Sequence, residues 1–350
     1  MKASMRKILT SICIILSFYC KGQTGDSIVR GEILSIAEKI ARDGMIVDTL
    51  FLRNLNALKP YLSQWERFIE LREKATDNEL IVLTNHLNEI VRCYAFRALV
   101  MNNNVNCFEI LKNHLIDYKQ IRIHWCDYSK HKHISCFPSV GDYFIFCVST
   151  PISENSYLLN NQQKKELDSI VLYNDSIYLS YRSCLLQRLK PDLAHYERVR
   201  EIVLKYDGEL VALATLARYQ NPNDIPIFKD FFKPYRRFSD GMYFLLLAIR
   251  EYPDSAFYKD LVKTLKRNRG NWRLLYQTLA QYPTDETVKL FEKIAKEKKL
   301  NTKKADLMIA ITKYPHEKYE HLKNKLKIDD KILAELWEEE KKATEWENGE

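Results

Sequence analysis

The chain has 350 residues and a formal net charge of +8, with 46% apolar residues, 29% charged residues and only nine glycines. So few glycines disfavour barrels, sandwiches and glycine-rich nucleotide loops, because these structures need residues with positive φ. The motifs G-x-G-x-x-G, G-x-x-x-x-G-K-S/T, H-E-x-x-H and G-x-S-x-G do not occur, which removes the motif basis for dinucleotide-binding, P-loop, zincin and serine-hydrolase assignments.

Residues 1–22 have the pattern of a secretory signal peptide. A basic start, Lys2–Lys7, precedes the apolar stretch Ile8–Tyr19, which is shorter than the about 20 apolar residues of a membrane-spanning helix. Small side chains just upstream predict cleavage before Gln23. Attachment of a lipid at Cys20 is the less favoured alternative, because aromatic residues precede that cysteine. We therefore expect a secreted or periplasmic protein without a transmembrane segment after signal removal.

The N-terminal region, residues 23–117, is predicted to be helical. Apolar residues recur at helical spacing in Ile28–Ala41, Asp48–Lys74 and Asn106–Ile116. A further segment, residues 77–101, has an apolar first helix, a short polar turn and a second helix that contains small alanines. This segment resembles a HEAT repeat, in which two antiparallel helices form one repeat unit.

Residues 118–160 interrupt the helical pattern. Ile121–Trp125 and Tyr143–Val148 are rich in β-branched and aromatic residues, and the turn-like stretch Pro138–Gly141 lies between them. This pattern predicts a small β-hairpin or irregular insertion between repeat helices. The segment Met45–Leu52 is too short to assign to a helix or a strand.

Four side chains that could bind a metal lie within that insertion: Cys126, His131, His133 and Cys136, spaced C-x4-H-x-H-x2-C. Zinc takes cysteine and histidine in tetrahedral sets of four, but this spacing matches no familiar zinc finger. In an exported protein the two cysteines could instead form a disulfide, and the cluster could also have no special role. The three alternatives stay open, and we assign neither a metal nor a cofactor.

The C-terminal region, residues 161–328, repeats a pattern of about thirty residues. Four helices are predicted to end at a tyrosine that a turn follows closely; these tyrosines, Tyr219, Tyr252, Tyr282 and Tyr314, are 33, 30 and 32 residues apart. Apolar residues three, six and seven positions before each tyrosine mark one helical face. A second amphipathic segment follows each turn: Ile225–Lys233, Ala256–Lys266, Thr287–Lys296 and Lys318–Leu326. This period is typical of an α-solenoid, and residues 193–328 resemble the HEAT-repeat family.

Together these repeats predict an all-α protein, a HEAT-like α-α superhelix with a small irregular or β insertion at residues 118–160. The resemblance implies that the second helices line the concave surface. These helices carry lysines at spacings of three and four, which place them on one helical face: Lys259, Lys263, Lys266, Lys289, Lys293 and Lys296, followed by Lys323 and Lys325. Such a stripe is either a solvated face or a groove for an acidic partner.

Residues 329–350 carry nine acidic residues against three lysines, and one apolar stripe among them predicts a charged capping helix and tail. No catalytic constellation competes with these features. We therefore expect an exported scaffold that binds a protein or an acidic polymer on its concave surface, and export disfavours nucleic acid as the partner. The alternative is an envelope enzyme whose site is formed by residues 118–160 against the repeats.

Overall fold

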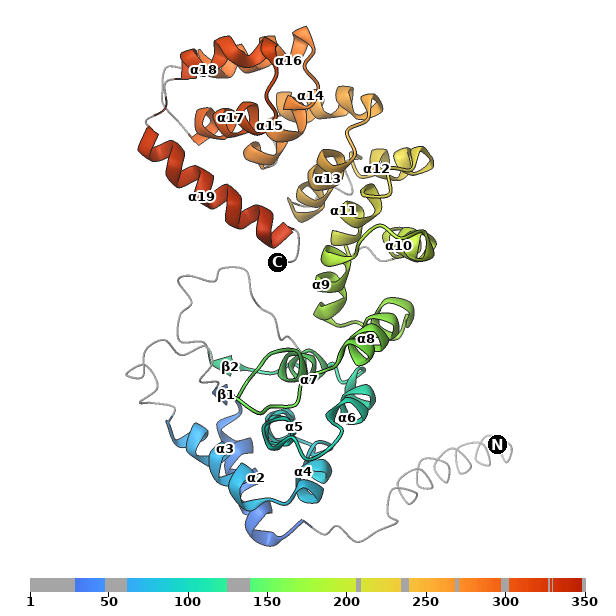
Figure 1. Ribbon diagram of the computed structural model, residues 1–350, viewed down its shortest axis with the longest axis vertical. Helices are drawn as coiled ribbons and strands as arrows, with labels where there is room; N and C mark the ends of the chain where they lie inside the picture. Colours follow the sequence, from blue (N-terminus) through green and yellow to red (C-terminus); the bar gives the residue numbers. More distant parts are fainter. Residues whose placement is uncertain are drawn as a thin grey trace, which may run out of the picture. The chain divides into compact units, whose positions relative to one another are not determined.

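The structure of the chain is a computed structural model, in which most of the described residues are helical (Figure 1). The described residues are 29–47, 62–124, 139–205, 209–233, 239–267, 271–296, 302–326, 328 and 330–347. They confirm the predicted all-α class. Among them, no helix is both long enough and apolar enough to cross a lipid bilayer. The predicted signal peptide, residues 1–22, lies outside the described part of the chain.

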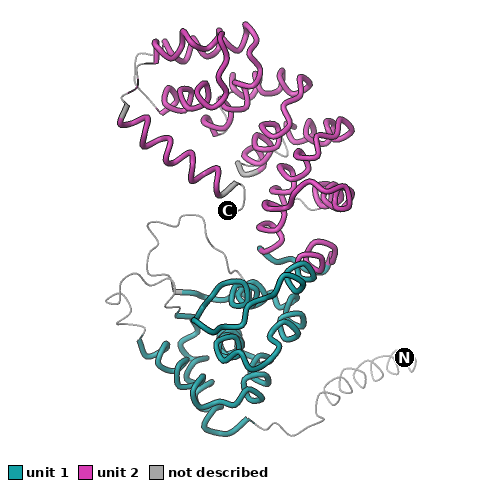
Figure 2. Tube along the Cα trace, viewed as in Figure 1, with its two compact units in different colours: residues 1–167, 176–180 teal, residues 168–175, 181–350 magenta. Residues whose placement is uncertain are grey.

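The chain divides into two compact units (Figure 2). Unit 1 consists of residues 1–167 and 176–180, and unit 2 consists of residues 168–175 and 181–350. The helices of unit 1 are α2 (Gly31–Asp43), α3 (Leu62–Lys74), α4 (Asp77–Leu83), α5 (Glu89–Asn102), α6 (Cys107–His114) and α7 (Val140–Ser149). Helix α8 (Asn161–Tyr173) contains a boundary between the units.

Helix α5 forms the centre of unit 1. Ten of its fourteen residues are buried, and helices α2, α3, α4 and α7 pack against it. The side chain of Asn88 starts the helix, because it accepts hydrogen bonds from the backbone N–H groups of Ile90 and Val91 at 3.0 and 3.2 Å. Asn103 ends it with a left-handed backbone, φ 54°. Helices α4 and α5 form the helical hairpin that the sequence predicts for residues 77–101.

Helix α7 shows that the strand predicted at Tyr143–Val148 is wrong. Ser139 starts the helix by accepting a hydrogen bond from the backbone N–H of Asp142 at 3.2 Å. The helix packs against α5 and α6, and Phe144 stacks on Phe96 of α5 with ring centroids 3.9 Å apart. Nearly every residue of α7 is buried. In a short continuous apolar run, the spacing of apolar residues cannot distinguish a buried helix from a buried strand.

A glycine allows α7 to approach the end of α6. A Cβ atom at Gly141 would lie 2.9 Å from the backbone oxygen of His114 and 3.0 Å from Leu179 Cδ2. We expect Gly141→Ala to lower the free energy of unfolding of unit 1 by about 1–3 kcal/mol, because backbone must shift to relieve this contact. Urea denaturation followed by circular dichroism measures the loss. Gly31→Ala is the control, because no atom lies within 4 Å of a Cβ at that position; an equal loss in both variants would contradict the close-approach explanation.

Two short strands join distant parts of unit 1. β1 (Ile46–Val47) and β2 (Ile123–His124) pair in parallel, with Ile46 opposite Ile123. The strand character predicted for Ile121–Trp125 is thus confirmed at β2, but β2 pairs with β1 instead of with a second strand of the insertion. An isolated antiparallel bridge also pairs Gln120 with Ser139, the residue directly before α7.

Unit 2 is a series of helical hairpins. Its helices are α9 (Ser180–Arg188), α10 (Leu193–Lys205), α11 (Val211–Ala217), α12 (Ile225–Asp230), α13 (Ser239–Glu251), α14 (Tyr258–Lys266), α15 (Trp272–Ala280), α16 (Asp285–Ala295), α17 (Thr302–Lys313), α18 (Glu320–Leu326) and α19 (Asp330–Glu347). Short 3-10 helices, η3 (Pro222–Asp224), η5 (Ser255–Phe257) and η6 (Glu317–Tyr319), precede α12, α14 and α18. Each predicted tyrosine-ended helix and each predicted second segment coincides with one of these helices.

Hydrogen bonds between successive hairpins involve two of the four recurring tyrosines, Tyr219 and Tyr282. Helices α11, α13, α15 and α17 pack against one another in chain order. The hydroxyl of Tyr219 donates to the backbone oxygen of Asp192, and the hydroxyl of Tyr282 donates to the backbone oxygen of Asp254, both at 3.0 Å. Each acceptor directly follows the proline of an earlier turn. The tyrosine of one hairpin therefore fixes its distance from the turn of the hairpin before it.

The second helices α12, α14, α16 and α18 lie beside the tyrosine-ended helices. Each packs against a tyrosine-ended helix of its own or the next hairpin. The buried ring of Phe291 in α16 lies 6.1 Å from the ring of Tyr276 in α15 and 5.6 Å from that of Tyr319. One side of each second helix is therefore occupied by core residues, and the other side is left for charged residues.

Candidate functional site: the lysine face of helices α14 and α16

All six lysines that the sequence predicts as partner-binding residues are exposed. Three lie on α14, and three lie on or directly after α16: Lys259, Lys263 and Lys266, then Lys289, Lys293 and Lys296. We call the surface that these six side chains form the lysine face. It lies entirely within unit 2.

The lysine face is built by the repeat itself. The lysines of α14 follow Tyr252 by seven, eleven and fourteen residues, and those of α16 follow Tyr282 by the same numbers. The side chains of Asp254 and Thr284 cap the two hairpins at equivalent places, by accepting hydrogen bonds from the backbone N–H groups of Ala256 and Thr287. Because Asp254 and Thr284 both lie two residues after their tyrosines, the three lysines of one hairpin stand at the same sequence distances from the cap as the three lysines of the other, although the 3-10 helix η5 precedes α14.

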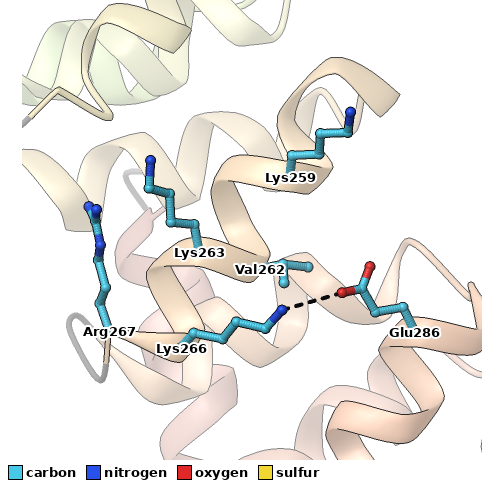
Figure 3. A pocket seen from close by; sticks show the side chains of 6 residues that line it. All are labelled: Lys259, Val262, Lys263, Lys266, Arg267 and Glu286. Carbon is cyan, nitrogen blue, oxygen red and sulfur yellow. Dashed lines mark ion pairs between the residues drawn. The ribbon is translucent and has the colours of Figure 1, made fainter.

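A groove of about 420 Å³ runs along this surface (Figure 3). Its lining comes from α14, the residue that follows it and α16: Lys259, Val262, Lys263, Lys266, Arg267 and Glu286. Lys266 reaches across the groove to Glu286, with Nζ 3.5 Å from the carboxylate. In Figure 3 the side chains of Lys259, Lys263 and Arg267 extend away from that carboxylate.

Most lysines of the lysine face lie beyond ion-pair distance of a carboxylate in the described part of the chain. Within the described part of the chain, no carboxylate forms an ion pair with five of the lysines: Lys259, Lys263, Lys289, Lys293 and Lys296. Residues three or four apart on one helix lie about 5–6 Å apart, which is less than the Debye length of about 8 Å at physiological salt. The five ammonium groups therefore add their potentials, and the surface attracts anions.

The positive surface ends at α18. A second groove, of about 400 Å³, lies between α16 and α18, and it is lined by two acidic residues, Asp285 and Glu292, beside Lys289 of the lysine face. Lys318 lies 2.8 Å from Asp285, and His321 lies 2.9 Å from Glu292. Hydrogen bonds from Lys318 and His321 lower the pKa of the Asp285 and Glu292 carboxyl groups, respectively. The sequence predicts that the row of lysines continues through Lys325. In the structure Lys325 forms an ion pair with Glu292, because its Nζ lies 3.4 Å from that carboxylate.

The charge of the groove lining on the lysine face favours an anionic ligand. The lining holds ammonium, guanidinium and carboxylate groups, without a serine, cysteine or histidine. Among the described residues, no group of three or more histidine, cysteine or acidic side chains is arranged to hold a metal ion. The weak metal candidates, Cys126, His131, His133 and Cys136, fall in residues 125–138, outside the described residues.

A polar surface on the tyrosine-ended helices is missing from the sequence-based prediction. Gln277 of α15 is buried, and it contacts Arg250 of α13 and Glu340 of α19. A cavity of about 390 Å³ lies beside these residues. The only signal in the sequence is a glutamine within the apolar helix Trp272–Ala280, and one polar residue does not identify its partners.

Comparison of the chain with protein-family models, with curated proteins and with solved structures finds no match. The function must therefore be argued from the geometry of the chain itself.

Proposed function

We propose that the chain is an exported, non-catalytic scaffold of HEAT-like helical repeats, and that its lysine face binds an acidic segment of a partner protein. The observation that carries this proposal is the set of five lysines without ion-pair partners in the described part of the chain, placed in equal register on α14 and α16. Lysines that served only solubility would not need equal positions on the two helices, because solubility depends on the amount of surface charge and not on how the charges are aligned.

The packing of unit 2 supports a repeat architecture. Helices α11, α13, α15 and α17 contact their neighbours in chain order, as expected for a stack in which each hairpin shields the apolar side of the next. Side chains also cross between neighbours: Thr278 Oγ1 donates to the backbone oxygen of Leu246 at 3.3 Å, and Gln281 Nε2 donates to that of Arg250 at 3.2 Å. A stack of this kind presents a continuous surface, which suits binding of an extended partner.

Export supports a protein partner over nucleic acid. The signal-peptide pattern of residues 1–22 predicts that the chain leaves the cytoplasm. A lysine ammonium group pairs with a carboxylate as readily as with a phosphate, because it acts as a compact charge without a fixed hydrogen-bond geometry. The charge of the lysine face therefore fits an acidic peptide. An exported protein would meet little nucleic acid, which disfavours nucleic acid as the partner.

Charge reversal on the lysine face tests the proposal. A short poly-glutamate peptide with a fluorescent label is titrated into the full chain, and fluorescence anisotropy gives Kd. We expect Lys263→Glu/Lys293→Glu to raise Kd by about 10–30-fold, because two attractive pairs become repulsive and each pair contributes up to about 1 kcal/mol. We also expect the affinity of the natural chain to fall as salt is raised.

Two exposed lysines of equal charge serve as the control. Lys164 and Lys190 lie outside the lysine face and form no ion pair in the described part of the chain, so Lys164→Glu/Lys190→Glu should leave Kd nearly unchanged. Equal effects of the two double variants would show attraction by net charge alone. Binding that ignores both salt and Lys263→Glu/Lys293→Glu, or tighter binding of duplex DNA than of the peptide, would overturn the proposal.

A further inference from the structure

Helix α19 is attached to the rest of unit 2 through a buried carboxylate. It packs against α17, and in Figure 1 α17 lies between α18 and α19. Glu340 of α19 is only 4% exposed. Its Oε1 accepts hydrogen bonds from Gln277 Nε2 at 2.8 Å and from Lys313 Nζ at 2.6 Å. One glutamate of α19 therefore binds donors from α15 and α17 at once.

The adjacent glutamate makes a second contact with α15. Glu339 Oε2 lies 3.3 Å from Arg273 Nη2, and Arg273 Nε also donates to Asp306 of α17 at 2.9 Å. Two consecutive acidic residues on α19 thus meet two cations and one amide on α15 and α17. We call the side of α13, α15 and α17 that carries these donors the first-helix face.

Apolar contacts hold α19 only weakly. Among its residues with described burial, Glu340 alone is buried, whereas Leu333, Leu336 and Trp337 are half-buried and Ile332 is exposed. Apolar side chains at half burial contribute a fraction of the about 1.5–3 kcal/mol that full burial gives. In proteins most of the stability of a helix comes from its tertiary packing. Because α19 depends mainly on its ion pairs, it can leave the first-helix face without unfolding the helices beneath it.

The first-helix face is organised for an acidic ligand. Gln277 is buried, and its Oε1 accepts a hydrogen bond from Arg250 Nη1 at 3.1 Å, so its amide N–H₂ group is directed at Glu340. Arg273 is fixed by Asp306. These donors stand on packed helices, which lowers the entropy lost when a ligand binds. The cavity of about 390 Å³ next to Glu340 leaves room for side chains larger than those of α19.

We propose that the first-helix face is a binding site for an acidic helix of a partner protein, and that α19 occupies this site in the unbound chain as an internal competitor. The partner helix would carry two consecutive acidic residues, which take the places of Glu339 and Glu340 and bind Arg273, Gln277 and Lys313. This site is separate from the lysine face, and the inference does not depend on the function proposed for that face.

Release of α19 tests the inference. The probe is a fluorescently labelled peptide of residues 330–347, titrated into the full chain. In the natural chain the tethered α19 competes at an effective concentration in the millimolar range, so the peptide binds weakly. We expect Glu340→Lys to lower the Kd of the peptide at least tenfold, because a lysine opposite Lys313 expels α19 from the site. Glu340→Gln, which keeps the shape of the side chain, should act in the same direction with a smaller effect.

Matched variants separate release from general charge effects. Glu335 is an exposed glutamate of the same helix, so Glu335→Lys changes the charge equally and should leave Kd unchanged. Lys313→Glu should abolish peptide binding in the Glu340→Lys background, and Lys263→Glu/Lys293→Glu should not affect it. These variants therefore distinguish a failure of the function proposed for the lysine face from a failure of the inference about α19.

Hydrogen exchange gives an independent readout. Backbone amides of residues 330–347 should exchange at least tenfold faster in Glu340→Lys than in Glu335→Lys, whereas the amides of α15 stay protected. The inference is overturned if Glu340→Lys and Glu335→Lys bind the peptide equally, or if α19 keeps its protection in Glu340→Lys. Loss of protection throughout unit 2 in both Glu340 variants would also overturn it, because α19 would then be part of the core.

Discussion

Tyr282→Ala should lower the free energy of unfolding of unit 2 by about 3–4 kcal/mol. The side chain is only 9% exposed, its hydroxyl donates to the backbone oxygen of Asp254 at 3.0 Å, and its ring lies 5.7 Å from that of Tyr258. Removing a buried aromatic ring costs about 3–5 kcal/mol in transfer and cavity terms. The lower half of this range applies because the site lies at the edge of the hairpin interface, where neighbours can partly close the space.

Tyr282→Phe separates the hydrogen bond from the ring. It keeps the packing and removes only the donor to Asp254, so we expect a loss of about 1 kcal/mol. Hydrogen exchange read helix by helix is the appropriate measurement, because a chain of two units does not unfold in one step. Tyr282→Ala should speed exchange in α13 and α15 first, since stability in a stack depends on neighbouring interfaces. Exchange that changes in unit 1 as much as in α15 would contradict this view.

The same contacts explain which part of the fold the sequence predicts. Two of the four recurring tyrosines, Tyr219 and Tyr282, bind a turn in the hairpin before them, so at these hairpins the period of the sequence is the period of the packing. The lysine face was predictable for the same reason, because Lys263 and Lys293 hold equal places after their tyrosines. A feature that is repeated along the chain can be read from one sequence.

Features that occur once were not predictable. Five of the six residues of the run Tyr143–Val148 are buried in the structure, so its composition suggested a strand while tertiary packing makes it a helix. The contact of Glu340 with Gln277 joins residues 63 positions apart, and an acidic helix by itself does not show which surface it meets. The burial of Asp142 beside Ser139 is likewise a product of packing around α7.

Glu79→Gln, which replaces a buried carboxylate by an amide, should lower the free energy of unfolding of unit 1. Glu79 is only 5% exposed, and its two oxygens accept hydrogen bonds from Arg30 N, Nε and Nη2 and from Thr76 N, at 2.8–3.0 Å. An amide at this position turns one acceptor into a donor that faces other donors. We expect a loss of about 2–4 kcal/mol at neutral pH, because charge-assisted hydrogen bonds contribute about 1.5–3 kcal/mol each and part of the loss is recovered by relaxation.

The pH dependence of that loss follows from the direction of the pKa shift. The Arg30 guanidinium holds the pKa of the Glu79 carboxyl well below its usual range, whereas in the unfolded chain this pKa is about 4.3. A group with a lowered pKa in the folded state binds fewer protons there, so its stabilisation is complete above about pH 4.3 and falls as the pH drops below that value. The difference in unfolding free energy between the natural chain and Glu79→Gln should therefore be constant near neutral pH and shrink in acid. Urea titrations over this pH range measure it, with Glu73→Gln, an exposed residue of the neighbouring helix, as the control. A difference that stays constant down to about pH 3 would mean that packing, and not the charge of Glu79, accounts for the loss.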